Sequence, residues 1–515
     1  MGFYHSTRSA SPTFTSKEAI RRGIAPDGGL FVSDDLGGTT IDISTLASKD
    51  YPTLAREVMG ALLPDYSADE IAACVDEAYT GTFASSEVTP LVPISQAPNA
   101  DGTPTYVMEL FGGPTSAFKD VALQMLPRLM ARTAGAEGEH IMIVTATSGD
   151  TGKAALAGFA DAPGCGITVF YPEGKVSHVQ NLQMSTQEGA NVAVCAVRGN
   201  FDDAQTAVKQ IFANKELGER LAQSGTVLSS ANSINVGRLV PQVVYYFAAY
   251  AQLLRVGAIE VGDAVEFCVP TGNFGDILAG YYAKRMGLPV AKLLVASDKN
   301  NVLADFLATG TYDRERPFYT TTSPSMDILV SSNLERMLYY LADGDCELVA
   351  DLMSKLTDKG NYQIPAELLE RIRTVFDGGW ADEDQVAAAI RRCWDENGYV
   401  IDPHTACGYH VMEQTAAVEG TACRVLLSTA SPYKFPKAVA EALGLFCPPD
   451  DFACMEVLAK HTGTTAPAQL AGLKTKPVRF EDVVDVADMG SYVEQAASRI
   501  AEEAISAALG AASIS

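Results

Sequence analysis

The sequence predicts an α/β fold with an additional N-terminal domain. From about residue 140, short runs of β-branched residues alternate with longer segments of helical period, a pattern typical of parallel strands joined by crossover helices. At 515 residues, the chain is long enough for about three domains and needs no disulfide or metal to hold its core. Six apolar runs are expected to be strands: residues 141–145, 167–171, 191–197, 265–269, 293–296 and 425–427.

The first part of the chain is expected to form a domain of its own. Residues 1–100 lead into the loop 97–104, whose Pro, Asn, Asp and Gly residues are typical of a domain boundary. Residues 101–515 then make up the main region. Within it, residues 312–380 have a mostly helical period, and their sequence gives no indication of chemistry.

The composition excludes several classes of partner. The 38 Lys and Arg against 63 Asp and Glu give a net charge of −25, which disfavours nucleic acid and anionic membranes as partners. No apolar run reaches the ~20 residues of a membrane helix. The ten cysteines form no C-x-x-C pair, so no metal site is predicted. Most are expected to be buried thiols in a reducing compartment, and the cytoplasm is the simplest location.

The first segment with chemical content surrounds Lys119. A Gly-Gly-Pro turn and two hydroxyl residues, Thr115 and Ser116, precede an apolar-periodic run and are expected to cap a helix. Lys119 then falls in the first helical turn, where the positive end of the helix dipole lowers the pKa of an amine. More free amine suits a lysine that forms a Schiff base. A lysine whose charged end simply reaches solvent is the alternative.

Two further segments are predicted to bind anions. The turn Ser148–Gly152 and the turn Thr271–Asp276 each follow a strand and precede a helix, so their backbone N–H groups point at one place. The first turn suits a small carboxylate and departs from the Walker A pattern. The second has no Lys or Arg, which suits a cofactor phosphate held by amides. Tight turns without a ligand are the alternative for both.

Other polar residues extend this predicted site. Thr429 follows the strand at 425–427 and offers a neutral hydrogen bond to a heteroaromatic nitrogen. Asn235 and Arg238 lie at the start of an apolar helix, and Lys175 follows another strand. The two cations are candidates for binding a substrate phosphate, with a solvated surface position as the alternative for each.

Together these segments resemble those of threonine synthases, which are pyridoxal-phosphate enzymes of fold type II, in their long fungal and proteobacterial form. The likeness runs from end to end. It includes Tyr-His-Ser-Thr-Arg at residues 4–8, Pro-Thr-Ser-Ala-Phe-Lys-Asp at 114–120, Thr-Ser-Gly-Asp-Thr-Gly at 147–152, Asn-Ser-Ile-Asn at 232–235 and Pro-Thr-Gly-Asn-Phe-Gly-Asp at 270–276.

The resemblance implies a tryptophan-synthase-β-like fold with two open α/β subdomains, the smaller at roughly 135–235, beside the N-terminal domain. It implies pyridoxal 5′-phosphate as the cofactor and no metal. The implied substrate is O-phospho-L-homoserine, which reacts with water to give L-threonine and phosphate in the last step of threonine biosynthesis.

The resemblance also assigns roles to residues. Lys119 would bind the cofactor covalently and act as the catalytic residue. Asp150 stands where other fold type II enzymes commonly have asparagine beside the cofactor's 3′-oxygen, which leaves the protonation of that oxygen open. The implied cofactor-binding residues are Lys119, Asp150, Gly272, Asn273, Phe274, Gly275, Asp276 and Thr429. The implied substrate-binding residues are Ser148, Gly149, Thr151 and Gly152, to which Lys175, Asn235 and Arg238 are added as candidates from their place in the sequence.

Two other kinds of function remain open at this point. One is a different fold type II enzyme: a serine or threonine dehydratase, a cysteine-forming synthase or a phospholyase. The length, the N-terminal domain and the Asn-Ser-Ile-Asn stretch disfavour these enzymes. The other is an inactive relative that only binds, which the intact Lys119 and glycine turn disfavour. The base for water addition and the choice between monomer and homodimer are also left open.

Overall fold

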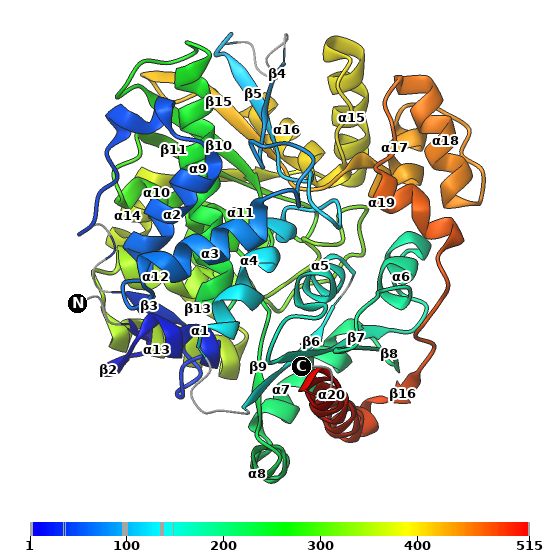
Figure 1. Ribbon diagram of the computed structural model, residues 1–515. Coiled ribbons are helices and arrows are strands. Elements are labelled where there is room, and N and C mark those ends of the chain that lie inside the picture. The colour runs from blue at the N-terminus through cyan, green and yellow to red at the C-terminus, as the bar shows by residue number, and fades with distance from the viewer. Residues whose placement is uncertain are drawn as a thin grey trace.

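Two mainly parallel sheets form the framework of the chain (Figure 1). The computed structural model describes residues 4–33, 36, 38–94, 101–133, 139–147 and 149–512, with the backbone alone at residues 202 and 503–512. The larger sheet has the strand order β14-β11-β10-β15-β5-β4 and the smaller sheet the order β16-β8-β7-β6-β9. All neighbouring strands are parallel except β4 and β5.

The six predicted strands are confirmed, and each lies inside a sheet. The larger sheet contains β4 (Leu91–Ile94), β5 (Thr105–Glu109), β10 (Ala264–Pro270), β11 (Val290–Ser297), β14 (Phe376–Trp380) and β15 (Thr421–Ser428). The smaller sheet contains β6 (His140–Ala146), β7 (Cys165–Pro172), β8 (Val192–Arg198), β9 (Thr226–Ser229) and β16 (Val483–Asp485). The β-branched residues of β6, β7, β8, β10 and β11 are buried on both faces, as expected for parallel strands covered by helices, whereas the valines of β4, β9 and β16 at the sheet edges are only partly buried.

The N-terminal segment builds a small antiparallel sheet and a helical layer. The sheet consists of β1 (Tyr4–Ser6), β2 (Ser9–Phe14) and β3 (Phe31–Ser33). The helices are α1 (Ser16–Arg22), the short η1 (Ile43–Ser48), α2 (Tyr51–Leu62) and α3 (Ala68–Tyr79). Although β4 lies within residues 1–100, it pairs with β5 in the larger sheet. The division into domains stays a prediction, and the boundary loop falls partly outside the described residues.

Helices cover the faces of both sheets. Those nearest the larger sheet include α9 (Val236–Arg255), which is buried from Val236 to Leu253 and packs against α2, α4 and α10. Helices of the first half of the main region are α4 (Lys119–Ala131), α5 (Asp150–Phe159), α6 (His178–Ser185), α7 (Phe201–Ala213), α8 (Lys215–Gln223) and α10 (Gly275–Arg285).

The region that sequence left without a role, residues 312–380, is not purely helical. It contains α12 (Leu334–Leu341), α13 (Cys346–Lys359) and α14 (Ala366–Val375). It also contains β14 and most of a two-stranded pair, β12 (Thr311–Asp313) with β13 (Asn361–Gln363), which follows α11 (Val302–Thr309). A stretch without regular structure, residues 323–333, precedes α12.

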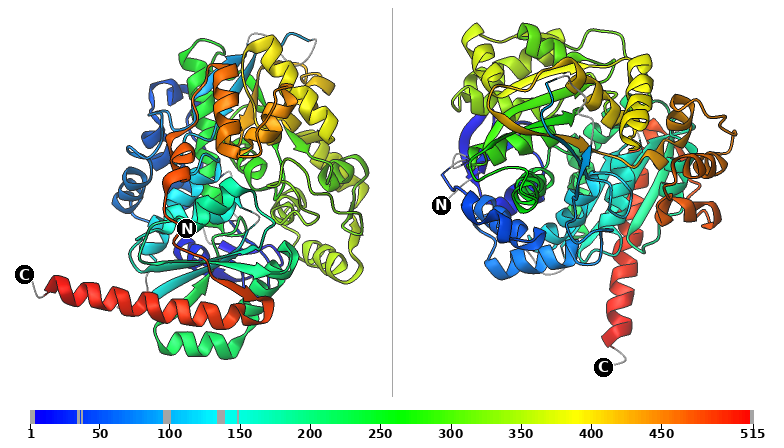
Figure 2. Two further views of the ribbon diagram at one scale, coloured as in Figure 1. Left: turned by 90° about the vertical axis from the view of Figure 1, so that its right-hand side faces the viewer. Right: turned by 90° about the horizontal axis from the view of Figure 1, so that it is seen from above.

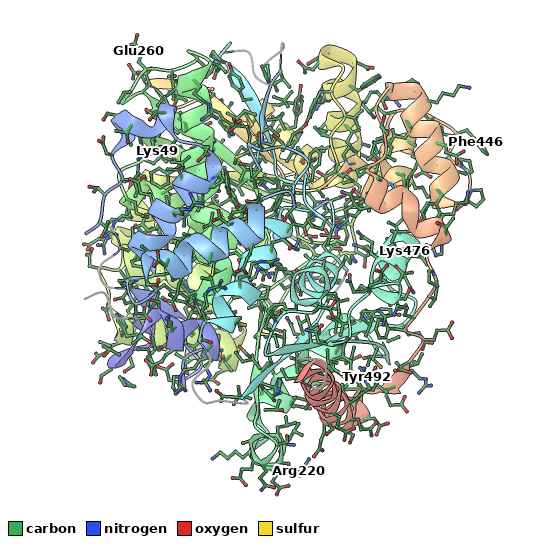
Figure 3. The ribbon with its side chains drawn as sticks, in the orientation of Figure 1. Lys49, Arg220, Glu260, Phe446, Lys476 and Tyr492 are labelled. Atoms are coloured by element: carbon green, nitrogen blue, oxygen red, sulfur yellow. A yellow bond between two sulfur atoms is a disulfide. The ribbon has the colours of Figure 1, made fainter. Side chains whose placement is uncertain are left out.

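The C-terminal part crosses from the larger sheet to the smaller one. Its elements are α15 (Glu383–Asn397), α16 (Pro403–Gln414), η2 (Pro432–Lys434), α17 (Pro436–Ala442), α18 (Asp451–Thr462), α19 (Ala468–Ala471), η3 (Gly472–Thr475), η4 (Val486–Asp488) and α20 (Met489–Ala512). Figure 2 shows α20 running along the smaller sheet and extending beyond it. Tyr492, labelled in Figure 3, packs edge-on against Phe170 of β7.

The cysteines are only partly as expected. Seven are buried thiols, but Cys447 and Cys454 form a disulfide beside α18. Sequence did not indicate this pair because the two cysteines are seven residues apart and form no recognised motif. Phe446, next to the disulfide, is 85% exposed at the edge of the molecule (Figure 3). In the described part of the chain, every helix is too short or too polar to cross a lipid bilayer.

Candidate active site

Lys119 is buried at the start of α4, in the first helical turn as predicted, with only 7% of its surface exposed. The chain just before it pairs with the end of β15. The N–H of Phe118 donates to the carbonyl of Thr429 at 2.8 Å, and the N–H of Ser431 donates to the carbonyl of Ser116 at 3.1 Å. This backbone pairing brings Lys119 and Thr429 together at the carboxyl edge of the larger sheet, where ligands of open α/β sheets bind.

The predicted caps of α4 are wrong. Phe118 occupies the N-cap position and makes no capping bond with its side chain. The buried carboxylate of Asp120 instead turns back and accepts hydrogen bonds from the N–H and the hydroxyl of Thr115, at 2.8 and 2.7 Å. Ser116 adopts a left-handed backbone conformation, with φ 59°. The turn before Lys119 is therefore fixed by Asp120, and the hydroxyl residues do not cap the helix.

The pKa of Lys119 is lowered to about 8, in the predicted direction. Burial is the largest cause, since a charged amine loses its hydration there. The carboxylate of Asp150 acts in the opposite sense, while the charges of Lys434 and Arg238 lower the pKa further. A substantial fraction of neutral amine is therefore present near neutral pH, as a nucleophilic lysine requires.

Asp150, the first residue of α5, is the acidic centre of the site. Its oxygen Oδ1 lies 2.6 Å from Nζ of Lys434 and accepts a hydrogen bond from Gln180 at 3.1 Å. Its oxygen Oδ2 accepts a hydrogen bond from the hydroxyl of Ser325 at 3.1 Å and lies 4.0 Å from Nζ of Lys119. Burial alone would raise the pKa of Asp150, but the two lysines outweigh burial and hold this pKa well below its usual value.

The loop before Asp150 is held by one threonine. The N–H groups of Gly149 and Gly152 both donate to the hydroxyl of Thr147, at 3.0 and 2.9 Å. Gly149 has φ 141° and lies so close to the Gln180 amide that a Cβ atom there would overlap it. Thr151 is half-buried beside them. Ser148 lies outside the described residues.

The glycine turn after β10 is covered by residues 323–333. A Cβ atom on Gly272 would lie 2.9 Å from the carbonyl oxygen of Ser325, so only glycine fits beneath this segment. The carbonyl of Asn273 accepts a bond from the N–H of Asn333 at 3.0 Å. Phe274 has φ 60°, a strained conformation for a bulky residue, and Gly275 starts α10. Such a turn points successive N–H groups into one concavity, which suits a phosphate.

Asp276, in the first turn of α10, is surrounded by tyrosines. The hydroxyls of Tyr245 and Tyr246 on α9 both donate to its oxygen Oδ1. Its other oxygen, Oδ2, is buried without a hydrogen-bond partner among the described residues. Burial is the largest influence and raises the pKa of Asp276 to about 6, against the opposing effect of the tyrosine hydrogen bonds.

The three remaining predicted residues have different surroundings. Arg238 is buried, donates to the carbonyl of Ala231 at 2.8 Å, and has an Nε group without a partner among the described residues. Burial lowers the pKa of Arg238 to about 10. The amide of Asn235 caps α9 and donates to the carbonyls of Ile20 and Ser230, which uses both of its N–H groups. Lys175 is exposed and makes no ion pair with a described residue.

Sequence reasoning missed three members of this group. Lys434 and Ser325 contact Asp150, and Nζ of Lys119 donates to the Ser325 hydroxyl at 3.3 Å. The backbone N–H of Ser325 donates to Nε2 of His404, whose Nδ1 lies 2.6 Å from Asp402. The lysine in Ser-Pro-Tyr-Lys, just after Thr429, was a signal for Lys434. Nothing in the sequence places residue 325 beside residue 119.

Comparisons with known proteins support the same conclusion about family. A family model described as pyridoxal-phosphate dependent enzyme matches residues 84–428, and models for the threonine synthase N terminus and C-terminal region match residues 3–79 and 405–493. Threonine synthase from Schizosaccharomyces pombe is 38% identical over 478 residues, covering 86% of this chain and 90% of that protein. The chain belongs to the threonine synthase family.

Other members of the threonine synthase family differ in length. Human Threonine synthase-like 1 is 38% identical over 452 residues, which cover 83% of this chain and 58% of the human protein. The chain therefore spans less than two thirds of that curated relative. A crystal structure of pyridoxal-phosphate-bound threonine synthase from Brucella melitensis is 37% identical, with a TM-score of 0.83 and coverage of 96% of this chain and 100% of that one. The predicted fold class is confirmed.

The cofactor of this family, pyridoxal phosphate, fits the residues present. A buried lysine with a lowered pKa, a glycine turn at a helix N-terminus and a hydroxyl at the end of β15 are the groups that an aldehyde, a phosphate and a pyridine nitrogen require. The unpartnered Nε of Arg238 adds a buried cation that another anion can neutralise.

Proposed function

We propose that this chain is a threonine synthase, which converts O-phospho-L-homoserine and water into L-threonine and phosphate. The observation that carries the proposal is the match to threonine synthases over nearly their whole length, 90% of the Schizosaccharomyces pombe enzyme and 100% of the Brucella melitensis chain. The buried cation Arg238, close enough to influence Lys119, supports a substrate that brings its own phosphate.

The proposal assigns cofactor binding to residues from separate elements. Lys119 binds the aldehyde carbon, and Gly272, Asn273, Phe274, Gly275 and Asp276 surround the phosphate through the turn at the start of α10. Thr429 offers its hydroxyl to the pyridine nitrogen, and Asp150 lies beside the 3′-oxygen. These roles are supported by the burial of Lys119, Asp150 and Thr429 and by the absence of space for a side chain at Gly272.

Substrate binding is assigned to the turn before α5 and to the start of α9. Ser148, Gly149, Thr151 and Gly152 form the proposed carboxylate site, in which a substrate would share the N–H groups that donate to Thr147. Arg238 is the proposed partner of the substrate phosphate. Asn235 acts by fixing the start of α9, since its N–H groups are already bonded. Lys175 takes part only if its exposed turn moves toward the substrate.

When bound, the cofactor would supply a place for the electrons of the carbon that carries the substrate's amino group. The amine of Lys119 has a pKa lowered to about 8 and only a long, 4.0 Å contact with Asp150, so we assign to it the transfer of protons at the substrate's α and β carbons. Arg238 binds the phosphate as it leaves the γ carbon, and water then adds at the β carbon. Residues 323–333 lie over the turn at Gly272, and we assign to them the role of limiting the entry of other water.

The proposal extends to the cellular location, the oligomeric state and the partners of the enzyme. The seven buried thiols support a cytoplasmic location, because thiols persist in a reducing compartment, whereas the disulfide Cys447–Cys454 is of a kind rare there. A monomer or a homodimer is proposed, with no nucleic acid or membrane as partner, on the strength of the net charge of −25.

The direct test is amino-acid analysis after the full-length protein, loaded with pyridoxal phosphate, has been incubated with O-phospho-L-homoserine. Threonine and free phosphate are expected in equal amounts. Phosphate accompanied by 2-oxobutyrate would indicate a phospholyase and contradict the proposal. Lys119→Ala should lose both the visible absorbance of the bound cofactor and turnover, whereas the exposed, nearby Lys437→Met should keep both.

A further inference from the structure

Two buried lysines converge on a single carboxylate in this site. Nζ of Lys434 lies 2.6 Å from Oδ1 of Asp150, whereas Nζ of Lys119 lies 4.0 Å from Oδ2. The hydroxyl of Ser325 fills the longer gap, because it accepts from Lys119 at 3.3 Å and donates to Asp150 at 3.1 Å. The shorter ion pair of Asp150 is therefore with Lys434, whereas Lys119 makes a longer one and is hydrogen-bonded to the carboxylate only through the Ser325 hydroxyl.

The position of Lys434 is fixed by the same backbone that positions Lys119. Lys434 ends η2, whose first residue is Pro432, and its N–H donates to the carbonyl of Ser431 at 3.0 Å. Ser431 is in turn hydrogen-bonded to the chain before Lys119, at Ser116. The side chain of Lys434 is 0% exposed. An ammonium group buried so deeply needs a counter-ion, and Asp150 is its only ion-pair partner among the described residues.

We propose that Lys434 is a positioning residue of the enzyme: by pairing with Asp150, it engages the carboxylate that would otherwise pair more closely with Lys119, and so keeps a larger share of the Lys119 amine neutral and nucleophilic. The physical reason is that Lys434 and Lys119 compete for the negative charge of Asp150. Without Lys434, Asp150 would be an unpaired buried anion, and it would bind the nearest cation, the protonated form of Lys119. The loss of the positive charge of Lys434 acts in the same direction.

Other charged groups around Lys119 do not provide the same effect. Those that face it from packed elements are Asp150 of α5, Asp276 of α10, Arg238 of α9 and Lys434 of η2, while Asp120 follows it on α4 and His404 of α16 approaches through Ser325. Of the two cations that lower the pKa of Lys119, Lys434 and Arg238, only Lys434 pairs with a carboxylate among the described residues. The lowered pKa of Lys119 agrees with this arrangement.

The experiment compares the full-length wild type with Lys434→Met after removal of the cofactor. The rate of recombination with pyridoxal phosphate is followed by visible absorbance from pH 6.5 to pH 10. An upward shift of the Lys119 pKa by about one pH unit makes Lys434→Met about ten-fold slower at pH 7 and nearly equal above pH 9.5. The cofactor's own ionisation changes both rates by the same factor, so it cancels when the rate of Lys434→Met is divided by that of the wild type at each pH.

A ratio that stays constant with pH would overturn the inference, because a packing defect or weaker phosphate attraction slows recombination equally at every pH. Lys434→Arg keeps the charge and is expected to follow the wild-type profile; if it behaves as Lys434→Met does, charge is not the cause and the inference fails. Lys437→Met is the control, since Lys437 is exposed three residues away. If circular dichroism shows that Lys434→Met does not fold, Lys434→Gln replaces it. The ratio of its recombination rate to the wild-type rate should then change with pH in the same way.

The inference rests on the proposed role of Lys119, and the two fail differently. If Lys119 does not bind the cofactor, Lys119→Ala keeps the visible absorbance. If Lys434 does not act through Asp150, Lys119→Ala loses that absorbance but the ratio for Lys434→Met does not change with pH.

Discussion

The turn that starts α5 and the turn that starts α10 have the same construction but opposite electrostatics. Each follows a buried parallel strand, contains glycine, and places an aspartate in the first turn of a helix. Asp150 in the first turn faces two lysines, which hold its pKa well below the usual value. Asp276 in the second faces two tyrosine hydroxyls, and burial raises its pKa to about 6.

The difference shows that a local motif does not decide the charge of its own residues. Both helix starts favour an anion through their N–H groups and dipole. What separates them is the element that arrives from elsewhere: η2 brings Lys434 to Asp150, and α9 brings Tyr245 and Tyr246 to Asp276. The α5 turn thus keeps a permanent negative charge beside Lys119, whereas the α10 turn carries a carboxyl that can be neutral where a phosphate is proposed to bind.

The largest expected effect comes from Asp150→Asn. This change leaves the ammonium of Lys434 buried without its counter-ion, so the free energy of unfolding should fall by about 3–5 kcal/mol. Because the pKa of Asp150 lies below its unfolded value, its carboxylate stabilises the fold at all pH values above that range, and the loss should be similar at pH 5 and pH 8. Urea unfolding at both pH values measures it. A loss under about 1 kcal/mol would mean that the ion pair contributes little.

Asp276→Asn should change the free energy of unfolding in a way that depends on pH, unlike Asp150→Asn, and the variant should gain relative to wild type as pH rises. Its folded pKa, about 6, is above the ordinary aspartate value of 3.8 expected in the unfolded chain, so the protonated form stabilises the fold below pH 4 and this stabilisation is lost as pH rises through 6. The variant has no such loss. Its free energy of unfolding relative to wild type should therefore rise by about 2 kcal/mol between pH 4 and pH 8, measured by urea unfolding without cofactor. A flat difference across this range would show that Asp276 does not titrate there.

Gly272→Ala tests whether the α10 turn is held by backbone. The added Cβ would lie 2.9 Å from the Ser325 carbonyl oxygen and 3.2 Å from the Met326 Cα, neither of which can rotate away as the Gln180 side chain beside Gly149 can. Overpacking of about 1–3 kcal/mol should raise the dissociation constant for pyridoxal phosphate by about five- to 150-fold. Equilibrium titration by absorbance measures it. Gly472→Ala, with open space around it, should bind as the wild type does.

The smallest expected effect is that of Ser325→Ala. It removes the hydroxyl between Lys119 and Asp150 but leaves the ion pair with Lys434 in place, so turnover should fall about five-fold, as the loss of about 1 kcal/mol predicts. Steady-state kinetics with O-phospho-L-homoserine measures this. Ser332→Ala removes a more exposed hydroxyl from the same segment and serves as the control. If turnover falls equally in both variants, residues 323–333 matter as a whole, and the hydrogen bonds of Ser325 to Lys119 and Asp150 have no special effect.

The sequence was sufficient for the framework and for local chemistry. All six predicted strands are present, because runs of β-branched residues bounded by glycine have few other stable arrangements. The start of a helix at Lys119 and the two glycine turns were also predicted, since each depends on residues close together in the chain. The caps at Thr115 and Ser116 were not, because Asp120 competes for the same hydrogen bonds from inside the helix.

What the sequence by itself determined, then, is the α/β architecture and the family, and it predicted a lysine in the first turn of a helix that the structure finds buried with a lowered pKa. Only the tertiary structure decided the surroundings of that lysine. Ser325 and Lys434 lie 206 and 315 residues away from it along the chain, and the disulfide at Cys447 was also not foreseen. Periodicity and turn chemistry report on neighbours in sequence, whereas the charge of a buried group depends on whichever residues folding brings within a few ångströms of it.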